Sequence, residues 1–318
     1  MLSSSIGESS VRTGAAEAAP EAAVPHISVC ICTFKRPALL ATLLKGIFEQ
    51  RTDGKFTFSV VVVDNDRAGS ARETVERFGS ERIKYVIEPE QSIALARNRA
   101  MANARGDFVA CIDDDECPEK DWLFNLLETC LKYRVAGVLG PVKPAFEKEP
   151  PGWVIKGRFY DRPTHETGFV IPWTEGRTGN VLFRRSILEG VAPVFRPEFR
   201  SGGEDRNFFM RMIEAGHVFV WCDEAVAYET VPAVRCTRSF MLRRALLRGK
   251  MSLNHRTIGL KGVLISAAVV PIYSVTLPFL LLSGQHRFML FLIKICDHGG
   301  RILGFMGINP VRESYVVE

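Results

Sequence analysis

Four short apolar runs, separated by stretches with helical spacing, constrain the fold of this chain more than any other feature. The runs are ISVCICT (27–33), FSVVVVD (58–64), RIKYVI (82–87) and DFVACID (107–113). Strands with such continuous apolar sequence are buried on both faces, which is typical of parallel sheets covered by helices. The sequence therefore predicts an α/β fold with a parallel central sheet.

Helices are expected between and after these strands. Apolar residues at helical spacing, prolines suited to a first turn and capping residues predict helices that begin at Pro37, at a capping box of Ser70 and Glu73, at Ser92, at Pro118 and near Glu204. Further strands are expected at 135–140, 180–185 and 217–221. This order of strand and helix is that of successive βαβ units.

The composition is that of a globular protein with a mild positive charge. Hydrophobic residues make up 47% of the chain, the formal net charge is +5, and acidic residues are spread along the sequence, so a nucleic-acid binder is not favoured. The cysteines form no CxxC pair, which favours reduced thiols in a cytoplasmic setting over a structural zinc site. Residues 1–24 lack apolar periodicity and are expected to form a flexible tail.

Polar and charged residues gather where the predicted strands end. In open α/β sheets, ligands bind at the carboxyl ends of the strands. The candidates at these ends are Thr33, Arg36, Asp64, Asp66, Arg97, Asn98 and the run from Asp113 to Glu116.

The run Asp113-Asp114-Asp115 is the strongest of these signals. Three adjacent carboxylates with no basic residue beside them repel one another unless a cation or a polyhydroxylated ligand lies between them. Oxygen ligands of this kind suit Mg²⁺ or Mn²⁺. The alternative is a solvated turn that caps the next helix. No GxGxxG follows the first strand and no GxxxxGK[ST] occurs, so neither a dinucleotide-binding fold nor a P-loop NTPase is supported.

Four segments in order resemble the family 2 glycosyltransferases: ISVCICTFKRP, VVVDND, IALARNRAMANARGDFVACIDDDE and SGGEDRNFFMRMIEAG. The resemblance runs from about Ile27 to Tyr228, and the wording is similar to that of bacterial succinoglycan-type glucosyltransferases of exopolysaccharide synthesis. It implies a GT-A fold, which is a Rossmann-like, mostly parallel sheet flanked by helices. It also implies a nucleotide-sugar donor.

By this resemblance, the residues that contact the nucleotide sugar are Thr33, Arg36, Asp64, Asp66, Arg97, Asn98, Asp113, Asp114 and Asn180. Asp64 would bond to the base, and Arg97 would face the diphosphate. The alternative for Arg97 is an exposed helix face that it shares with Arg99 and Arg105. Two departures from the common family wording, Asn65 and Gln91-Ser92, affect only the expected base and donor contacts.

The resemblance also assigns a metal site and a general base. Asp113 and Asp115 match the outer positions of the family's DxD motif, so Asp115 would ligate the cation and Asp113 would reach the ribose or the metal. Asp205 matches the carboxylate that takes the proton from the acceptor hydroxyl in inverting enzymes. Glu204 would orient the acceptor or the base. The alternative for both is charge compensation at a helix N-terminus.

An irregular stretch at 141–178 has the length and composition of a functional loop. Its two tryptophans, Trp153 and Trp173, could stack on sugar rings or anchor the loop, and the sequence favours neither.

The C-terminal region has the composition of a membrane-associated segment. From Arg235 to Lys261 there are basic residues but no Asp or Glu, and residues 262–284 carry no formal charge. That apolar stretch is long enough to cross a bilayer, although Pro271 and Pro278 also suit a kinked or shallow insertion. A second apolar piece from 288 to 307 contains charges and is expected to be interfacial. A buried soluble helix pair is the alternative.

These observations predict a GT-A domain at 25–234 and a membrane-associated region at 235–318. We expect an inverting hexosyltransferase that moves a sugar from a UDP-sugar to a saccharide or lipid-linked acceptor, at the cytoplasmic face of the bacterial inner membrane. The alternatives are a metal-dependent nucleotidyltransferase and a non-catalytic sugar-nucleotide-binding membrane protein. Asp205 discriminates between catalysis and binding, because a binding protein needs no base.

Overall fold

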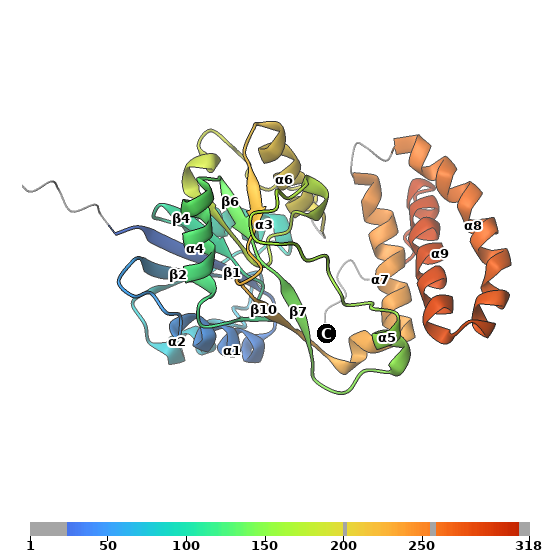
Figure 1. Cartoon of the computed structure of the whole chain (residues 1–318), viewed down its shortest axis with the longest axis horizontal. Helices are drawn as coiled ribbons and strands as arrows, with labels where there is room; N and C mark the ends of the chain where they lie inside the picture. The colour runs from blue at the N-terminus through green and yellow to red at the C-terminus, as the bar shows by residue number, and fades with distance from the viewer. Residues whose placement is uncertain (1–23, 200–201, 255–258, 312–318) are drawn as a thin grey trace, which may run out of the picture.

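The computed structural model describes residues 24–199, 202–254 and 259–311, so the expected flexible tail lies outside the described residues except for Val24. A seven-stranded sheet forms the centre of the fold, in the order β3-β2-β1-β4-β8-β6-β9 (Figure 1). Its strands are β1 (His26–Thr33), β2 (Thr57–Asp64), β3 (Ile83–Ile87), β4 (Phe108–Cys111), β6 (Gly137–Leu139), β8 (Val181–Arg184) and β9 (Phe219–Trp221). β8 runs antiparallel to both of its neighbours and the other pairs are parallel, so the sheet is mostly parallel.

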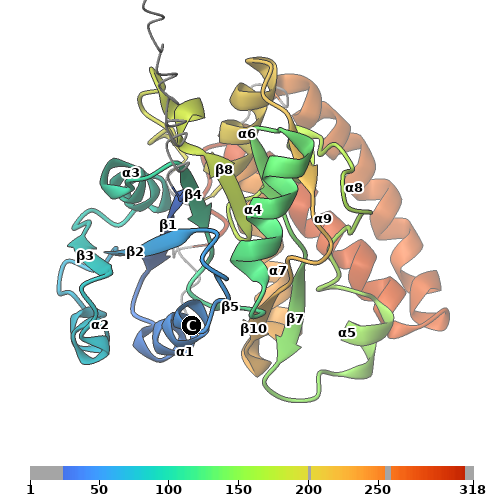
Figure 2. The same ribbon diagram turned by 60° about the vertical axis from the view of Figure 1, so that its left-hand side comes forward.

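Helices cover both faces of this sheet. They are α1 (Pro37–Phe48), α2 (Arg72–Phe78), α3 (Ile93–Asn103), α4 (Trp122–Tyr133) and α6 (Glu204–Glu214). One core cluster packs α1 and α4 against one face, and a second packs α3 and α6 against the other, as the two views show (Figure 2). This two-sided burial is the physical reason for the continuous apolar strands.

A small sheet lies beside the carboxyl edge of the large one. It consists of β5 (Glu116–Pro118), β10 (Ala227–Val231) and β7 (Val142–Phe146), with β10 in the centre. Because β5 follows the aspartate run directly, pairing with β10 fixes the position of that run. The expected helix start at Pro118 is therefore wrong: Pro118 pairs with Ala227 in this sheet, and α4 begins only at Trp122.

The expected capping box at Ser70 is also wrong. The helix begins after Ala71, and the buried Ser70 hydroxyl has no hydrogen-bond partner among the residues described here. The backbone N–H of Ala71 instead donates to the Asp64 carboxylate at 2.7 Å. A buried carboxylate from a neighbouring strand therefore replaces the local cap. At α3, by contrast, Ser92 is the N-cap and accepts from the Leu95 N–H, as the sequence predicts.

The described part of the C-terminal region contains the α-helices α7 (Arg238–Met251), α8 (Gly259–Leu282) and α9 (Gln285–Phe305). Figure 1 shows α7 on the side that faces the two sheets, and α9 packs against both α7 and α8. A third apolar cluster joins this region to the short helix α5 (Gly152–Lys156) through Val154, Phe240 and Ile293. By length and composition, α8 could cross a membrane, with a mean hydropathy of 2.0 and 11% of its apolar window buried.

Candidate active site

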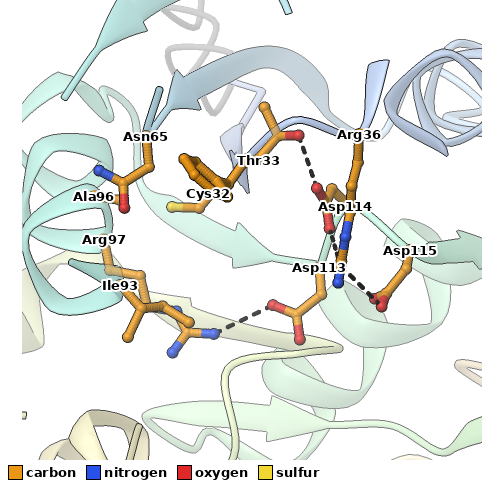
Figure 3. A pocket seen from close by; sticks show the side chains of 11 residues that line it. Cys32, Thr33, Arg36, Asn65, Ile93, Ala96, Arg97, Asp113, Asp114 and Asp115 are labelled. Carbon is orange, nitrogen blue, oxygen red and sulfur yellow. Dashed lines mark hydrogen bonds and ion pairs between the residues drawn. The ribbon is translucent and has the colours of Figure 1, made fainter. Parts of the chain in front are cut away.

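A pocket of about 160 Å³ lies at the carboxyl ends of β1, β2 and β4 (Figure 3). The pocket residues shared with the sequence prediction are Thr33, Arg36, Arg97, Asp113, Asp114 and Asp115. Cys32, Phe34, Asn65, Ile93 and Ala96 complete the lining. The strand ends that the sequence singles out therefore meet in one place, as the sheet topology requires.

The Asp114 side chain points inward, and its carboxylate has a structural role. Its carboxylate accepts a hydrogen bond from the Thr33 hydroxyl at 2.7 Å and pairs with Arg36 at 3.1 Å. Burial raises the pKa of Asp114 to about 6, and the neighbouring Arg36 guanidinium opposes that rise. Asp114 thus holds the end of β1 against the aspartate run.

Asp113 and Asp115 face different arginines. Asp113 pairs with Arg97 at 3.2 Å, and its side chain is 47% exposed. Asp115 is held at 3.2 Å by both Arg36 and Arg235. The expectation that no basic residue compensates the aspartate run is therefore wrong. Its basic partners are distant in sequence, so adjacency could not reveal them.

Arg97 connects the aspartate run to the second acidic site. Its guanidinium is buried and bonds to the carboxylate of Glu204 as well as to Asp113. Burial opposes the charge of Arg97, but the carboxylates of Asp113 and Asp205 outweigh it and raise the pKa of Arg97. The alternative of an exposed helix face is thus wrong for Arg97, and the start of α6 lies beside the pocket.

The two acidic residues at the start of α6 differ in environment. Glu204 is 2% exposed, and one of its carboxylate oxygens is buried with no partner in the part of the chain described. Asp205 is partly exposed, and among the residues that the structure describes it accepts a hydrogen bond only from the local N–H of Arg206, at 2.6 Å. Asp205 is consequently the carboxylate that can reach a bound molecule.

The structure does not bring four of the predicted contact residues into the pocket. Asp64 is fully buried and accepts hydrogen bonds from two backbone N–H groups and the Tyr85 hydroxyl. Asp66 bonds to the N–H of Ala68 in the same loop. The Asn98 amide bonds to the backbone of Phe195.

Asn180 is the clearest of these cases. It is fully buried, adopts a φ of 58°, accepts from the Trp122 indole at 2.7 Å, and donates to the carbonyls of Pro141 and Ala225. Its amide is committed to the fold rather than to a sugar. The tryptophans are likewise anchors: Trp153 packs edge-on against Phe159, and Trp173 packs on the core.

Several charged residues beyond the predicted strand ends also lie near the pocket, and they carry no local sequence signal. One of them, Glu229, lies opposite the predicted Glu116 in the small sheet, and burial raises the pKa of Glu116 well above its usual range. Arg162 and Arg235 bond to Glu229. Arg177, just before the Thr178-Gly179-Asn180 loop, has no hydrogen bond or ion pair in the described residues, and burial lowers its pKa.

The oxygen chemistry of the site fits a hard divalent cation. Among residues 24–199, 202–254 and 259–311, no three His, Cys, Asp or Glu groups form a ready metal cluster. However, Asp113 and Asp115 lie on the pocket wall, and a side chain at Gly179 would clash with Asp113 and Glu116. Gly179 thus keeps the backbone close to these carboxylates.

Comparisons with known proteins agree with this geometry. The family model described as glycosyl transferase family 2 matches residues 28–191. The succinoglycan biosynthesis protein ExoM of Rhizobium meliloti is 32% identical over 91% of this chain and 95% of its own length. A chondroitin synthase of Pasteurella multocida is 26% identical over 65% of this chain, which spans 25% of that longer protein.

Solved structures show the same fold. The S. aureus protein TarS in complex with UDP gives a TM-score of 0.53 at 17% identity, covering 90% of this chain and 93% of that one. Its complex with UDP-GlcNAc gives 0.53 at 16% identity, with the same coverage of both chains. The matched segment contains the end of β1, the start of α3 and the aspartate run, which contribute residues to the pocket. On this basis the chain belongs to glycosyl transferase family 2 and is a glycosyltransferase with a GT-A-type fold.

Proposed function

We propose that the chain transfers a hexose from a UDP-sugar to a lipid-linked saccharide, with inversion at the anomeric carbon, during exopolysaccharide synthesis. The observation that supports this most is the Arg97 guanidinium, which joins Asp113 of the aspartate run to the acidic start of α6. This pairing supports a donor-binding group and a general base close to one pocket. The donor complexes of TarS and the succinoglycan role of ExoM favour the same class of reaction.

The two halves of the pocket would have separate tasks. Arg36 and Arg97 can donate hydrogen bonds to the diphosphate of the nucleotide sugar, because their guanidinium groups line the pocket. Asp205 would accept the proton of the acceptor hydroxyl as its oxygen attacks the anomeric carbon. Glu204 is buried against Arg97, so it would position that guanidinium rather than meet substrate.

GT-A enzymes of this family generally use a divalent metal. In this chain Asp115 and Asp113 would hold Mg²⁺ or Mn²⁺, with Arg36 and Arg235 turning from Asp115 toward other anions. A cation bound there would neutralise negative charge on the departing nucleoside diphosphate. This role would account for Asp113 and Asp115, whereas Asp114 holds the end of β1.

The membrane would supply the acceptor. α8 carries large apolar side chains that are mostly exposed, including Val275 and Phe279 at 70% each. The preceding α7 contains Arg243, Arg244, Arg248 and Lys250, which suit anionic lipids at a cytoplasmic surface. We therefore place the enzyme at the cytoplasmic face of the bacterial inner membrane.

Release of nucleoside diphosphate from a panel of nucleotide sugars tests this function. We expect turnover with a UDP-sugar in Mn²⁺ or Mg²⁺ and none in EDTA, and we expect Asp115→Ala to lose turnover. Asp121→Ala is the matched control, since Asp121 lies outside the pocket and pairs with Arg51 on the surface. Unchanged turnover and metal dependence in Asp115→Ala would overturn the metal assignment.

A further inference from the structure

A second cavity, of about 200 Å³, lies between the catalytic domain and the C-terminal helices. We call it the interdomain cavity. Its walls are the segment 159–162, Glu229 of β10, Arg244 and Arg248 of α7, and Ile293 of α9, with Phe240 and Met241 at its apolar side. The cavity therefore faces both the catalytic domain and the helices that carry the apolar segment.

The charges that line this cavity are almost all paired. Arg162 bonds to Glu229, and Arg248 makes two bonds to Asp297 at 2.8 and 2.5 Å. Arg244 is different: the structure gives its side chain no hydrogen bond or ion pair within the described residues. One guanidinium in the cavity is consequently available to a ligand.

The surroundings of Arg244 oppose its charge. The cavity walls lower the pKa of Arg244, although its side chain is exposed to solvent. Glu229 acts in the opposite direction, but its carboxylate is already shared by Arg162 and Arg235. An exposed guanidinium that makes no hydrogen bond to the described residues can form charge-assisted hydrogen bonds to an anion.

Arg235 links this cavity to the active site. Its guanidinium bonds at 3.2 Å to Asp115 in the nucleotide pocket and at 3.2 Å to Glu229 in the interdomain cavity. The backbone of Asp115 also accepts from Thr230 of β10 at 2.7 Å. An anion beside Arg244 would thus lie behind the aspartate run, on the side toward α7.

We propose that the interdomain cavity is a binding site for a phosphate ester, and that its occupant is the phosphate or diphosphate of the membrane-anchored acceptor. The identity of this occupant rests on the proposed function. Arg244 contributes the charge, Arg162 can add a second guanidinium, and α7 connects the cavity directly to the apolar helices. An anionic membrane headgroup offers the same phosphate chemistry and is the competing source.

Calorimetric titration of inorganic pyrophosphate into the full chain tests the site without turnover. The titration is made in EDTA, once without UDP and once with saturating UDP, so that binding in the nucleotide pocket is recognised by its loss when UDP is present. We expect pyrophosphate to bind the wild type, and Arg244→Gln to weaken binding about tenfold or more, as loss of one charge-assisted hydrogen bond predicts. Arg287→Gln, an equal loss of charge at the exposed start of α9, should bind as the wild type does.

Two results would overturn the site: displacement of pyrophosphate by UDP, or wild-type affinity in Arg244→Gln. Competition experiments against bound pyrophosphate then identify the source of the phosphate group. We expect farnesyl diphosphate to displace pyrophosphate, whereas vesicles of phosphatidylcholine with phosphatidylglycerol should not. Displacement by those vesicles would assign the cavity to a headgroup and exclude the acceptor. Since no transfer is measured, an incorrect proposed function would leave the pyrophosphate result unaffected.

Discussion

Glu204 and Asp205 are neighbours in sequence, yet the start of α6 gives them opposite environments. Glu204 is turned into the protein against Arg97, while Asp205 stays partly exposed and accepts a hydrogen bond from the local backbone N–H of Arg206. A general base must reach the acceptor hydroxyl, and a positioning residue need not. The two carboxylates are adjacent in sequence, so it is their different burial that distinguishes their roles.

Asp205→Asn keeps the size of the side chain and removes its basicity. We expect transfer to fall about 10²- to 10⁴-fold with little change in affinity for UDP and Mn²⁺. Glu204→Gln should reduce transfer less, but it should lower the free energy of unfolding by about 3 kcal/mol, because it breaks a buried ion pair. Single-turnover transfer, UDP calorimetry and denaturant unfolding separate these effects. If only Glu204→Gln abolishes transfer, the two roles are exchanged.

Substitution of Asn180 tests whether this residue contacts a sugar or has a structural role. Its amide satisfies the Trp122 indole and two backbone carbonyls at a left-handed φ. We expect Asn180→Ala to lower the free energy of unfolding by about 3 kcal/mol, with UDP affinity unchanged in the folded fraction. Asn103→Ala is the control, because Asn103 makes one exposed local bond. A stable Asn180→Ala with weakened donor binding would restore the sugar-contact role.

The sequence predicts the residue types of the pocket but not their pairing. Thr33, Arg36 and the aspartate run follow from strand ends, since parallel strands bring those ends together. Arg235 could not be predicted, because it reaches Asp115 only through the pairing of β10 with β5. The hydrogen bonds of Asp64 depend in the same way on Tyr85 in β3.

At the scale of elements, the strands of the large sheet are predicted, but β5, β7 and β10 of the small sheet are not. The positions of the large-sheet strands follow from burial on both faces, which dominates the local sequence. Pro118 suits a helix start by its own geometry, but pairing with β10 draws it into β5. The antiparallel direction of β8 has no signature in a four-residue apolar strand and depends on the path of the chain through 141–180.

The exposed apolar side chains of α8 allow membrane association to be tested. Val275 and Phe279 are each 70% exposed, so substitution should leave the fold intact. We expect the double variant Val275→Asp and Phe279→Asp to lose co-sedimentation with vesicles while it retains UDP binding, because an aspartate in an inserted helix costs up to about 3 kcal/mol, with the largest cost at the helix centre. Val24→Asp, at an exposed valine before β1, is the control. Unchanged sedimentation of the double variant would exclude α8 as the membrane contact.

At the scale of the whole molecule, the catalytic domain and the apolar helix are connected through α7 and α9. These helices approach so closely that a Cβ added at Gly249 would overlap the carbonyl of Asp297, and one added at Gly300 would overlap the carbonyl of Leu246. The ion pair of Arg248 with Asp297 lies along the same interface. Removal of residues 262–318 would therefore expose α7 as well as delete the apolar segment. Point substitutions are the better probe of the packing between α7 and α9.

Two adjacent glycines in α9 provide a matched pair for that purpose. Gly300 faces α7 at backbone contact, whereas a Cβ at Gly299 would meet nothing within 4 Å. We expect Gly299→Ala to raise the free energy of unfolding by up to about 1 kcal/mol, since alanine favours the helix. Gly300→Ala should lower it by about 1 to 3 kcal/mol, because the added methyl group forces the two backbones apart. Thermal unfolding of the full chain in detergent, followed by intrinsic fluorescence, measures both changes against the wild type. UDP affinity should be the same in both variants, because the nucleotide pocket lies at the far side of α7. Equal stability of the two variants would show that α7 and α9 do not pack against each other at Gly300.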